Sequence, residues 1–164
     1  MPIVKITQLL PALVGLFVCM SGRAATTVSC TVTAGSIAFG IYNPLATSSN
    51  ASSGSLRIDC SGKGTGSAQV TANLTLSAGL SGSFSTRTML SGINKLNYNI
   101  YWSTAYNQIM GDGTGGSFGG SAGPFTVPAG GTNSATGTMY GLVPASQDVA
   151  PGSYLDTIVV TVTY

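Results

Sequence analysis

The chain of 164 residues contains no histidine and no glutamate, and only 6% of its residues are charged. These absences exclude catalytic triads built on histidine and hydrolysis by paired glutamates. The four aspartates are dispersed and mostly lie beside turn residues, where short carboxylate side chains usually cap the turn. We therefore expect no catalytic residue, no metal site and no cofactor, and hence no enzyme.

Positive charge is too scarce for a nucleic-acid-binding protein. Of the six lysines and arginines, Lys5 and Arg23 lie in the first 24 residues, so residues 25–164 carry four cations against four aspartates. No basic patch of the kind that binds nucleic acid remains, and no polybasic segment remains for a membrane surface. A neutral protein repels its own copies weakly, which suits a protein that packs against others.

The first 24 residues have the layout of a secretory signal peptide. A basic head ends at Lys5, residues 6–20 are mostly apolar, and Ser21-Gly22-Arg23-Ala24 supplies small residues. The apolar stretch is shorter than the ~20 residues that a spanning helix needs. We predict cleavage after Ala24, a single domain over residues 25–164, and export to the periplasm and then to the cell surface or the medium.

Two cysteines remain after this cleavage. Cys19 leaves with the signal peptide, and Cys30 and Cys60 stay. In an oxidising compartment such a pair most simply forms a disulfide. The alternative, a free reactive thiol, needs a neighbouring cation or imidazole, and the chain has no histidine.

Apolar residues of the remaining chain alternate with polar ones in short runs, which places each run on one face of a sheet. The runs are Val28–Val32, Ile37–Ile41, Leu56–Cys60, Val70–Leu76, Leu96–Trp102 and Tyr154–Tyr164, with a short piece at Phe125–Val127 and a further expected strand, Thr138–Val143, to which the pattern assigns no face. Turn clusters rich in glycine, serine and asparagine separate them, at residues 48–54, 61–67, 77–85, 111–123 and 129–135. This pattern predicts an all-β sandwich or barrel in one domain.

The run Tyr154–Tyr164 has the cleanest alternation, and the sequence ends within it. We expect this strand to have an open edge, which is an aggregation hazard that proteins normally block. The hypothesis that follows is that a strand of another chain fills the edge. The alternative is that the chain's own N-terminal strand covers it.

Four blocks of residues carry a resemblance to a known family. They are Phe39–Leu45, Arg87–Met89 with Leu96–Tyr101, Gly111–Gly116, and Tyr140–Pro144 with Pro151–Thr157 and the final strand. Together they resemble the spore coat protein U domain family, which includes the pilin subunits of archaic chaperone–usher pili. The block Gly111–Gly116 also fits a dinucleotide-binding pattern. That pattern must be followed by a helix, and the glycine-rich sequence after Gly116 does not form one.

The resemblance implies a single immunoglobulin-like β-sandwich that is incomplete because it lacks its last strand. It further implies three kinds of partner. A periplasmic pilus chaperone lends the missing strand, an outer-membrane usher exchanges it, and the N-terminal extension of another pilus subunit replaces it. The implied function is that of a secreted structural or adhesive subunit of a surface pilus, acting in cell adhesion and biofilm formation.

Carried over by position, the resemblance predicts which residues line the acceptor groove for the exchanged strand. One side is formed by Ile37, Phe39 and Ile41, and the other by Ile158, Val160, Val162 and Tyr164. Chaperones of such systems anchor the terminal carboxylate of the subunit, which here belongs to Tyr164.

Two departures from the family pattern affect these expectations. Met110 stands where the family often has tryptophan. Only residues Ala25–Ser29 precede Cys30 after cleavage, and five residues span about 17 Å, which is short for a donor strand. We therefore expect a subunit that accepts a strand but donates none, at the tip or end of a fibre.

Two other functions stay open at this point. The first is a stand-alone secreted coat or matrix protein whose N-terminus closes its own sheet. The second is a carbohydrate-binding module that uses Tyr101, Trp102 and Tyr106 as an aromatic surface, although a tryptophan in an alternating run favours the core. Recognition loops would be drawn from residues 111–123 and 129–135, because loops on rigid scaffolds carry recognition.

Overall fold

A computed structural model of the protein describes residues 25–164. The predicted signal peptide, residues 1–24, lies outside this range. Within residues 25–164, no helix is long and apolar enough to cross a membrane.

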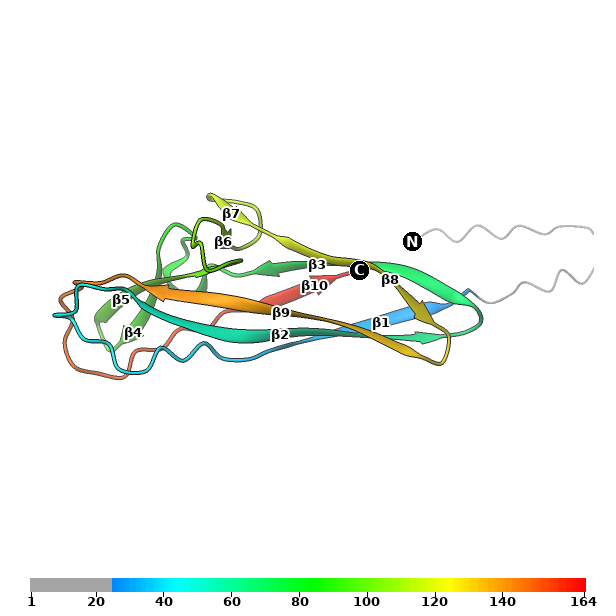
Figure 1. The fold of residues 1–164 in the computed structure, drawn as a ribbon, viewed down its shortest axis with the longest axis horizontal. Helices are drawn as coiled ribbons and strands as arrows, with labels where there is room; N and C mark the ends of the chain where they lie inside the picture. The colour runs from blue at the N-terminus through cyan, green and yellow to red at the C-terminus, as the bar shows by residue number, and fades with distance from the viewer. Residues whose placement is uncertain (1–24) are drawn as a thin grey trace, which may run out of the picture.

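Two mainly antiparallel β-sheets pack face to face over the described residues (Figure 1). The larger sheet has the order β1 (Thr27–Ala34), β2 (Asn50–Lys63), β9 (Thr132–Val143), β5 (Asn94–Tyr101), β6 (Ile109–Met110) and β7 (Ser117–Phe118), with β4 (Arg87–Ser91) paired to β5. The smaller sheet has the order β10 (Val160–Thr163), β3 (Ser67–Leu76) and β8 (Gly120–Pro128). One 3₁₀ turn, η1 (Gly79–Ser81), follows β3. The predicted all-β, immunoglobulin-like sandwich is therefore confirmed.

The core lies between the sheets and is built from the alternating residues that the sequence singled out. Leu56 and Ile58 of β2 are buried against Leu74 and Leu76 of β3 and against Ile100 of β5, in one apolar cluster. Removing apolar surface from water is the dominant favourable contribution to folding. Period-two alternation therefore predicts these three strands well.

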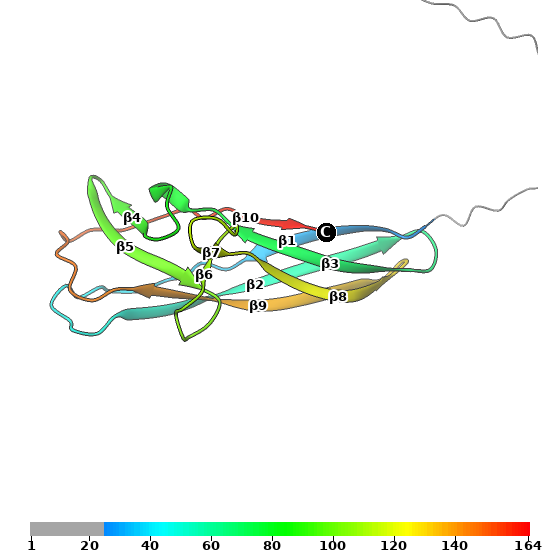
Figure 2. The ribbon, with the colours of Figure 1, turned by 90° about the horizontal axis from the view of Figure 1, so that it is seen from above.

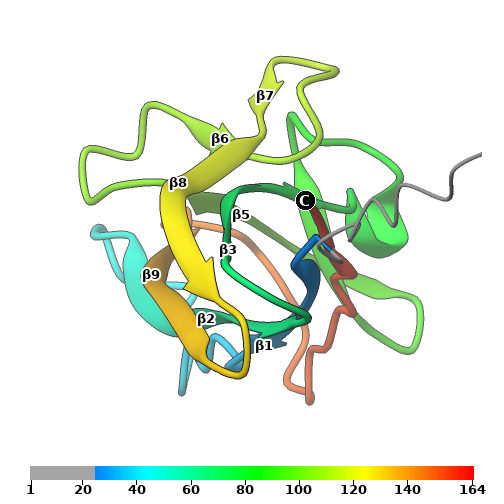
Figure 3. The ribbon, with the colours of Figure 1, turned by 90° about the vertical axis from the view of Figure 1, so that its right-hand side faces the viewer.

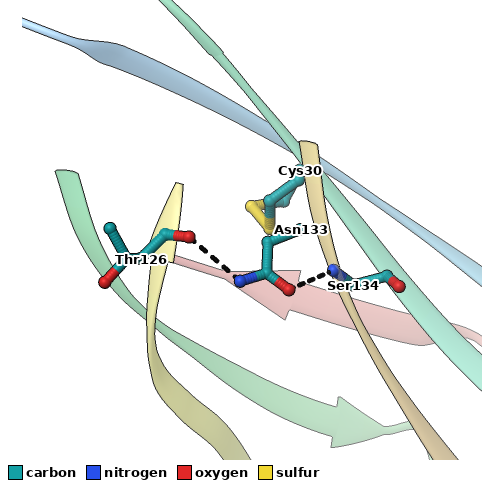
Figure 4. Close-up of a disulfide and its surroundings, with 5 residues drawn as sticks. Cys30, Thr126, Asn133 and Ser134 are labelled. Atoms are coloured by element: carbon teal, nitrogen blue, oxygen red, sulfur yellow. Dashed lines mark hydrogen bonds between the residues drawn. A yellow bond between two sulfur atoms is a disulfide. The ribbon is translucent and has the colours of Figure 1, made fainter. Parts of the chain in front are cut away.

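The cysteine pair lies at the edge of the larger sheet. Cys30 of β1 and Cys60 of β2 are direct partners in the antiparallel ladder and form a disulfide that closes a separation of 30 residues. Figure 4 shows this disulfide beside Asn133 of β9, whose side chain reaches Thr126 of β8. The predicted pairing is present, and it joins the outermost strand, β1, to the rest of the sheet.

Two predicted turn clusters are parts of strands instead. Strand β2 begins at Asn50 and β9 begins at Thr132, and the two pair without interruption along their length. Composition misleads here because Gly54 is not a turn residue. A Cβ at this position would lie 2.9 Å from Ile37 Cγ1, so glycine is needed for close packing inside the sheet.

Three other segments also depart from the predicted pattern. Residues 35–49 form no regular strand although Ile37–Ile41 alternates, and β10 covers only Val160–Thr163 of the predicted run. Ahead of β10, Leu155 forms a lone bridge to Leu90 of β4. Because β3 ends at Leu76 and the chain turns into η1, residues 156–159 have no continuous strand beside them. The predicted loop 111–123 contains β7 and the start of β8.

The sandwich has two seams along which the sheets meet. At one seam β8 and β9 follow each other through a tight turn, so the chain itself crosses between the sheets (Figure 3). At the other, β1 of the larger sheet runs next to β10 of the smaller one (Figure 2). These two strands belong to different sheets.

Candidate functional site

A groove runs along the seam between β1 and β10. One wall is the irregular segment after β1, residues 35–42, which we call the strap. The opposite wall is formed by residues 149–160. Two cavities lie between these walls, with volumes of about 410 Å³ and about 640 Å³. Ile37 and Met89 line both cavities, so the two are consecutive parts of one groove.

The floor of the groove is the hydrophobic core itself. Tyr98 and Ile100 of β5 and Met139 of β9 line the first cavity, and Leu96 of β5 lines the second. All four belong to the buried core cluster. The seam therefore leads directly from the surface to residues that a closed sandwich would seal.

A hydrogen-bonded carboxylate joins the second wall to the floor. The Tyr98 hydroxyl donates to Asp156 Oδ2 over 2.7 Å, and the Leu80 N–H donates to Asp156 Oδ1 over 2.9 Å. Burial, followed by the hydrogen bond to Asp156, raises the pKa of Tyr98 above its ordinary value of 10.0. Asp156 thereby fixes the wall relative to both β5 and η1.

Arg87 of β4 supports the floor from the side. Its side chain is fully buried and donates hydrogen bonds to the Ser77 carbonyl, the Met110 carbonyl and Asn99 Oδ1. It also lies over the ring of Phe84 at 5.2 Å. Burial lowers the pKa of the guanidinium group, and charge-assisted hydrogen bonds of this kind are among the strong ones in proteins. Arg87 therefore joins the ends of β3, β5 and β6.

The structure brings most of the predicted groove residues together. Ile37, Ile158 and Val160 line the first cavity, and Ile37, Phe39 and Ile41 line the second. Ile41 is 96% exposed at the mouth of the groove.

The remaining two predicted residues lie outside both cavities. Val162 pairs with Leu74 in the ladder between β10 and β3 and is half-buried. Tyr164 follows β10 and is 55% exposed. That the groove accepts a strand stays a prediction.

The sequence reasoning missed the residues of the floor and part of the second wall. Met89 and Tyr154 line both cavities, yet neither belongs to a predicted set of groove residues. Both lie in blocks that carry the family resemblance. The available signal was therefore the motif itself, since strand alternation does not reveal which core residues face a gap.

Other sequence-predicted residues have structural roles. Met110, at the position of the family tryptophan, is fully buried in the core. The Trp102 indole packs against the core, and its Nε1–H donates to the Phe118 carbonyl over 3.0 Å. Tyr101 and Tyr106 contact each other edge to face.

Asp112, the acid in the glycine-rich block, caps its own turn. Its Oδ1 accepts hydrogen bonds from the backbone and the hydroxyl of Thr114, which lower the pKa of the carboxyl group. Within residues 25–164, no three side chains of the metal-ligating types come together.

Comparisons with known proteins identify the family. The chain matches the Spore Coat Protein U domain over residues 16–161. No curated protein sequence matches it. In three dimensions it is similar to a chain of the crystal structure of the CsuC–CsuE chaperone–tip adhesion subunit pre-assembly complex, from archaic chaperone–usher Csu pili of Acinetobacter baumannii. The TM-score is 0.57 at 21% sequence identity, over 84% of this chain and 40% of that chain.

At this identity the likeness concerns the fold, and the protein spans less than half the length of its structural neighbour. The family match does not have this limit, because it is a match of sequence and includes all strands from β1 to β9 and the start of β10. The protein therefore belongs to the spore coat protein U domain family.

Proposed function

We propose that the protein is a subunit of a chaperone–usher surface pilus whose groove accepts a β-strand from another polypeptide. A periplasmic chaperone supplies this strand first, and another pilus subunit replaces it at an outer-membrane usher. The observation that carries the proposal is the seam between β1 and β10, where two cavities open onto the apolar core.

The shape of the groove fits an extended peptide. Nine consecutive residues of one wall, from Ala34 to Tyr42, border the two cavities, so the groove follows the whole length of the strap. Apolar side chains alternate along the wall, as a strand-binding surface requires. An edge of this kind left empty would promote aggregation, so a strand of a partner is the occupant that the groove favours.

The structural neighbour supports the class of partner. Its structure holds a chaperone and a tip adhesion subunit in a pre-assembly complex. The same arrangement in this protein would place a chaperone strand along the seam. A function of this kind includes no catalytic step. Export to the periplasm and display on the cell surface, with roles in adhesion and biofilm formation, belong to the same proposal.

We further propose that the subunit lies at the tip or end of its fibre. Strand β1 pairs with β2 from Thr27 onward. Cleavage after Ala24 would leave only Ala25 and Thr26 ahead of this strand, too few residues to reach into a neighbour. The mass of the mature protein shows where the signal peptide is cleaved. Cleavage nearer the N-terminus would leave room for a donor segment and would contradict the terminal position.

Expression with the natural signal peptide, with and without a pilus chaperone, tests the main proposal. We expect a stoichiometric complex with the chaperone, and aggregates or low yield without it, by size-exclusion chromatography. Ile158→Lys should abolish the complex because it puts a charge in the groove. Its matched control is Val159→Lys, since the Val159 side chain lies outside both cavities and is 60% exposed. A stable monomer without chaperone would instead favour a stand-alone coat or matrix protein.

A further inference from the structure

The strap leaves the backbone ladder of the larger sheet at one point. The pairing of β1 with β2 ends at Ala34 and Leu56, followed by a last hydrogen bond from the Gly35 N–H to the Ser55 carbonyl over 2.8 Å. Strand β2 continues beyond this point to Asn50, where its other side stays paired with β9. The side of β2 that faces the strap therefore meets residues that form no strand.

Two polar side chains of β2 take the place of the missing ladder. Ser52 Oγ donates to the carbonyl of Ala38 over 2.7 Å, and Asn50 Nδ2 donates to the carbonyl of Phe39 over 2.9 Å. Successive carbonyls of a regular strand point to opposite sides, whereas these two neighbouring carbonyls both bond to β2. Gly40, with a φ of 69°, permits this irregular course.

The strap is otherwise held by packing and at its far end. Ile37 and Phe39 lie against Gly141 of β9, where an added Cβ would come within 2.6 Å of Phe39 Cζ. At the far end, the Tyr42 hydroxyl donates to the Pro144 carbonyl over 3.0 Å. Hydrogen bonds therefore attach both ends of the strap, whereas apolar packing and the bonds of Asn50 and Ser52 hold its middle.

We propose that residues 36–41 form a movable gate of the groove, and that Asn50 and Ser52 are positioning residues that latch this gate to β2. The inference rests on the proposed function, because the gate acts on the entering strand. A partly exposed side-chain hydrogen bond contributes little net free energy. Opening the strap separates Ile37 and Phe39 from Gly141 but breaks no bond of the ladders between β1, β2 and β9, so it is a local opening and leaves the rest of the fold in place.

The latch determines how often the groove is wide enough to receive a strand. With Asn50 and Ser52 bonded, the strap lies against β2 and its apolar side chains line the cavities. When these bonds break, the wall moves without loss of the sheet. The two residues thereby set the rate of strand entry and leave the core of the sandwich unchanged.

Hydrogen exchange of the mature full chain, read by mass spectrometry, tests the latch without any ligand. We expect strap amides to exchange faster than those of β1. In Asn50→Asp and in Ser52→Ala, strap exchange should rise about fivefold, and exchange in β1 and β9 should not change. Ser52→Thr, which keeps the hydroxyl, should behave as the unmodified protein. Strap amides as slow as those of β1, or acceleration throughout the sandwich, would overturn the latch.

Asn133→Asp is the matched control. It removes the same kind of bond at the other seam, where Asn133 Nδ2 donates to the Thr126 carbonyl over 2.9 Å. We expect strap exchange in this variant to equal that of the unmodified protein. An equal rise in this variant would contradict a specific role of Asn50 and Ser52.

Uptake of a fluorescent nonapeptide of alternating valine and threonine tests the gate. The double variant Asn50→Asp/Ser52→Ala should take up the peptide about tenfold faster than the unmodified protein, and Asn133→Asp should match the unmodified protein. Equal rates in all three proteins would overturn the gate and leave the strand-accepting groove intact. No uptake by any of them would overturn the strand-accepting groove and with it the gate, while the exchange data would still decide the latch.

Discussion

The two seams of the sandwich are built from the same two sheets but differ in what covers them. At the β8–β9 seam, a tight turn carries the chain from one sheet to the other, and Asn133 of β9 bonds to Thr126 of β8. The cavity there measures only about 110 Å³. At the β1–β10 seam, the strap and residues 149–160 leave cavities of about 410 and 640 Å³.

The edges of the smaller sheet differ in the same way. Strand β8 carries Pro124, which lacks an N–H, and its register with β3 shifts between Val70 and Ala72. Proline and bulges on an edge strand oppose further pairing. Strand β10 has neither a proline nor a register shift. One seam is therefore closed by the chain itself, whereas at the other seam the edge strand β10 carries neither of the two features that oppose further pairing.

The largest expected effect concerns the strand that borders the open seam. Cys30→Ser with Cys60→Ser should lower the free energy of unfolding by roughly 3–4 kcal/mol, because it releases the loop of 30 residues that the disulfide closes. Urea denaturation of the variant and of the reduced unmodified protein measures it. A loss below about 1 kcal/mol would show that β1 is held without the disulfide.

The next largest effect is the loss of stability when a side chain is added at one of two glycines of β9. Gly141→Val should destabilise the protein by about 1–3 kcal/mol, because the new side chain collides with Ile37 and Phe39 of the strap. Gly137→Val should change stability little, since a Cβ there has no neighbour within 4 Å. Thermal unfolding of both variants measures the difference. Equal losses would mean that the strap does not rest on β9.

A smaller effect concerns the bond that crosses the closed seam. Asn133→Ala should cost about 0.5–1.5 kcal/mol, the usual net contribution of one hydrogen bond. Chaperone capture should remain intact, because the change lies away from the groove. Urea denaturation measures the first outcome and co-purification the second, and loss of capture would contradict the functional separation of the two seams.

The smallest effect depends on pH and concerns the floor of the open seam. Because burial holds the pKa of Tyr98 above 10.0, the folded protein keeps a proton that the unfolded chain releases above pH 10. Stability from this group is therefore full below pH 10 and falls as the pH rises further. Tyr98→Phe should show a shallower decline above pH 10, measured by denaturation between pH 8 and 11. An unchanged slope would place the Tyr98 hydroxyl in contact with water.

Alternation predicted the strands whose two sides face opposite environments. In β3 the buried residues are those that the period of two selects, from Val70 to Leu76, and in β5 the selected residues Leu96, Tyr98 and Ile100 are buried together with the polar Asn99. Alternation wrongly predicted a strand at Ile37–Ile41. Apolar residues alternate there along a segment that is attached to β2 by side-chain hydrogen bonds and not by a backbone ladder. Alternation also extended the last strand too far, because pairing needs a neighbour that β3 no longer provides after Leu76.

Glycine-rich composition wrongly predicted a turn where a glycine makes room for the side chain of another segment. Gly54 and Gly141 lie within strands because Ile37 and Phe39 occupy the space of their missing side chains. A glycine in a turn and a glycine under a packed side chain are identical in sequence. Which of the two applies depends on a segment that is distant along the chain.

The all-β class, the cysteine pair, the family and the apolar residues Ile37, Phe39 and Ile41 of one groove wall could be read from the amino-acid sequence, because each of these depends on local pattern or on motifs. The three-dimensional arrangement was needed to show that Tyr98, Ile100 and Met139 form part of the floor, that Arg87 supports it and that Asn50 and Ser52 hold the strap. The physical reason is that a groove is a gap between distant segments, and local periodicity does not encode where two sheets fail to meet.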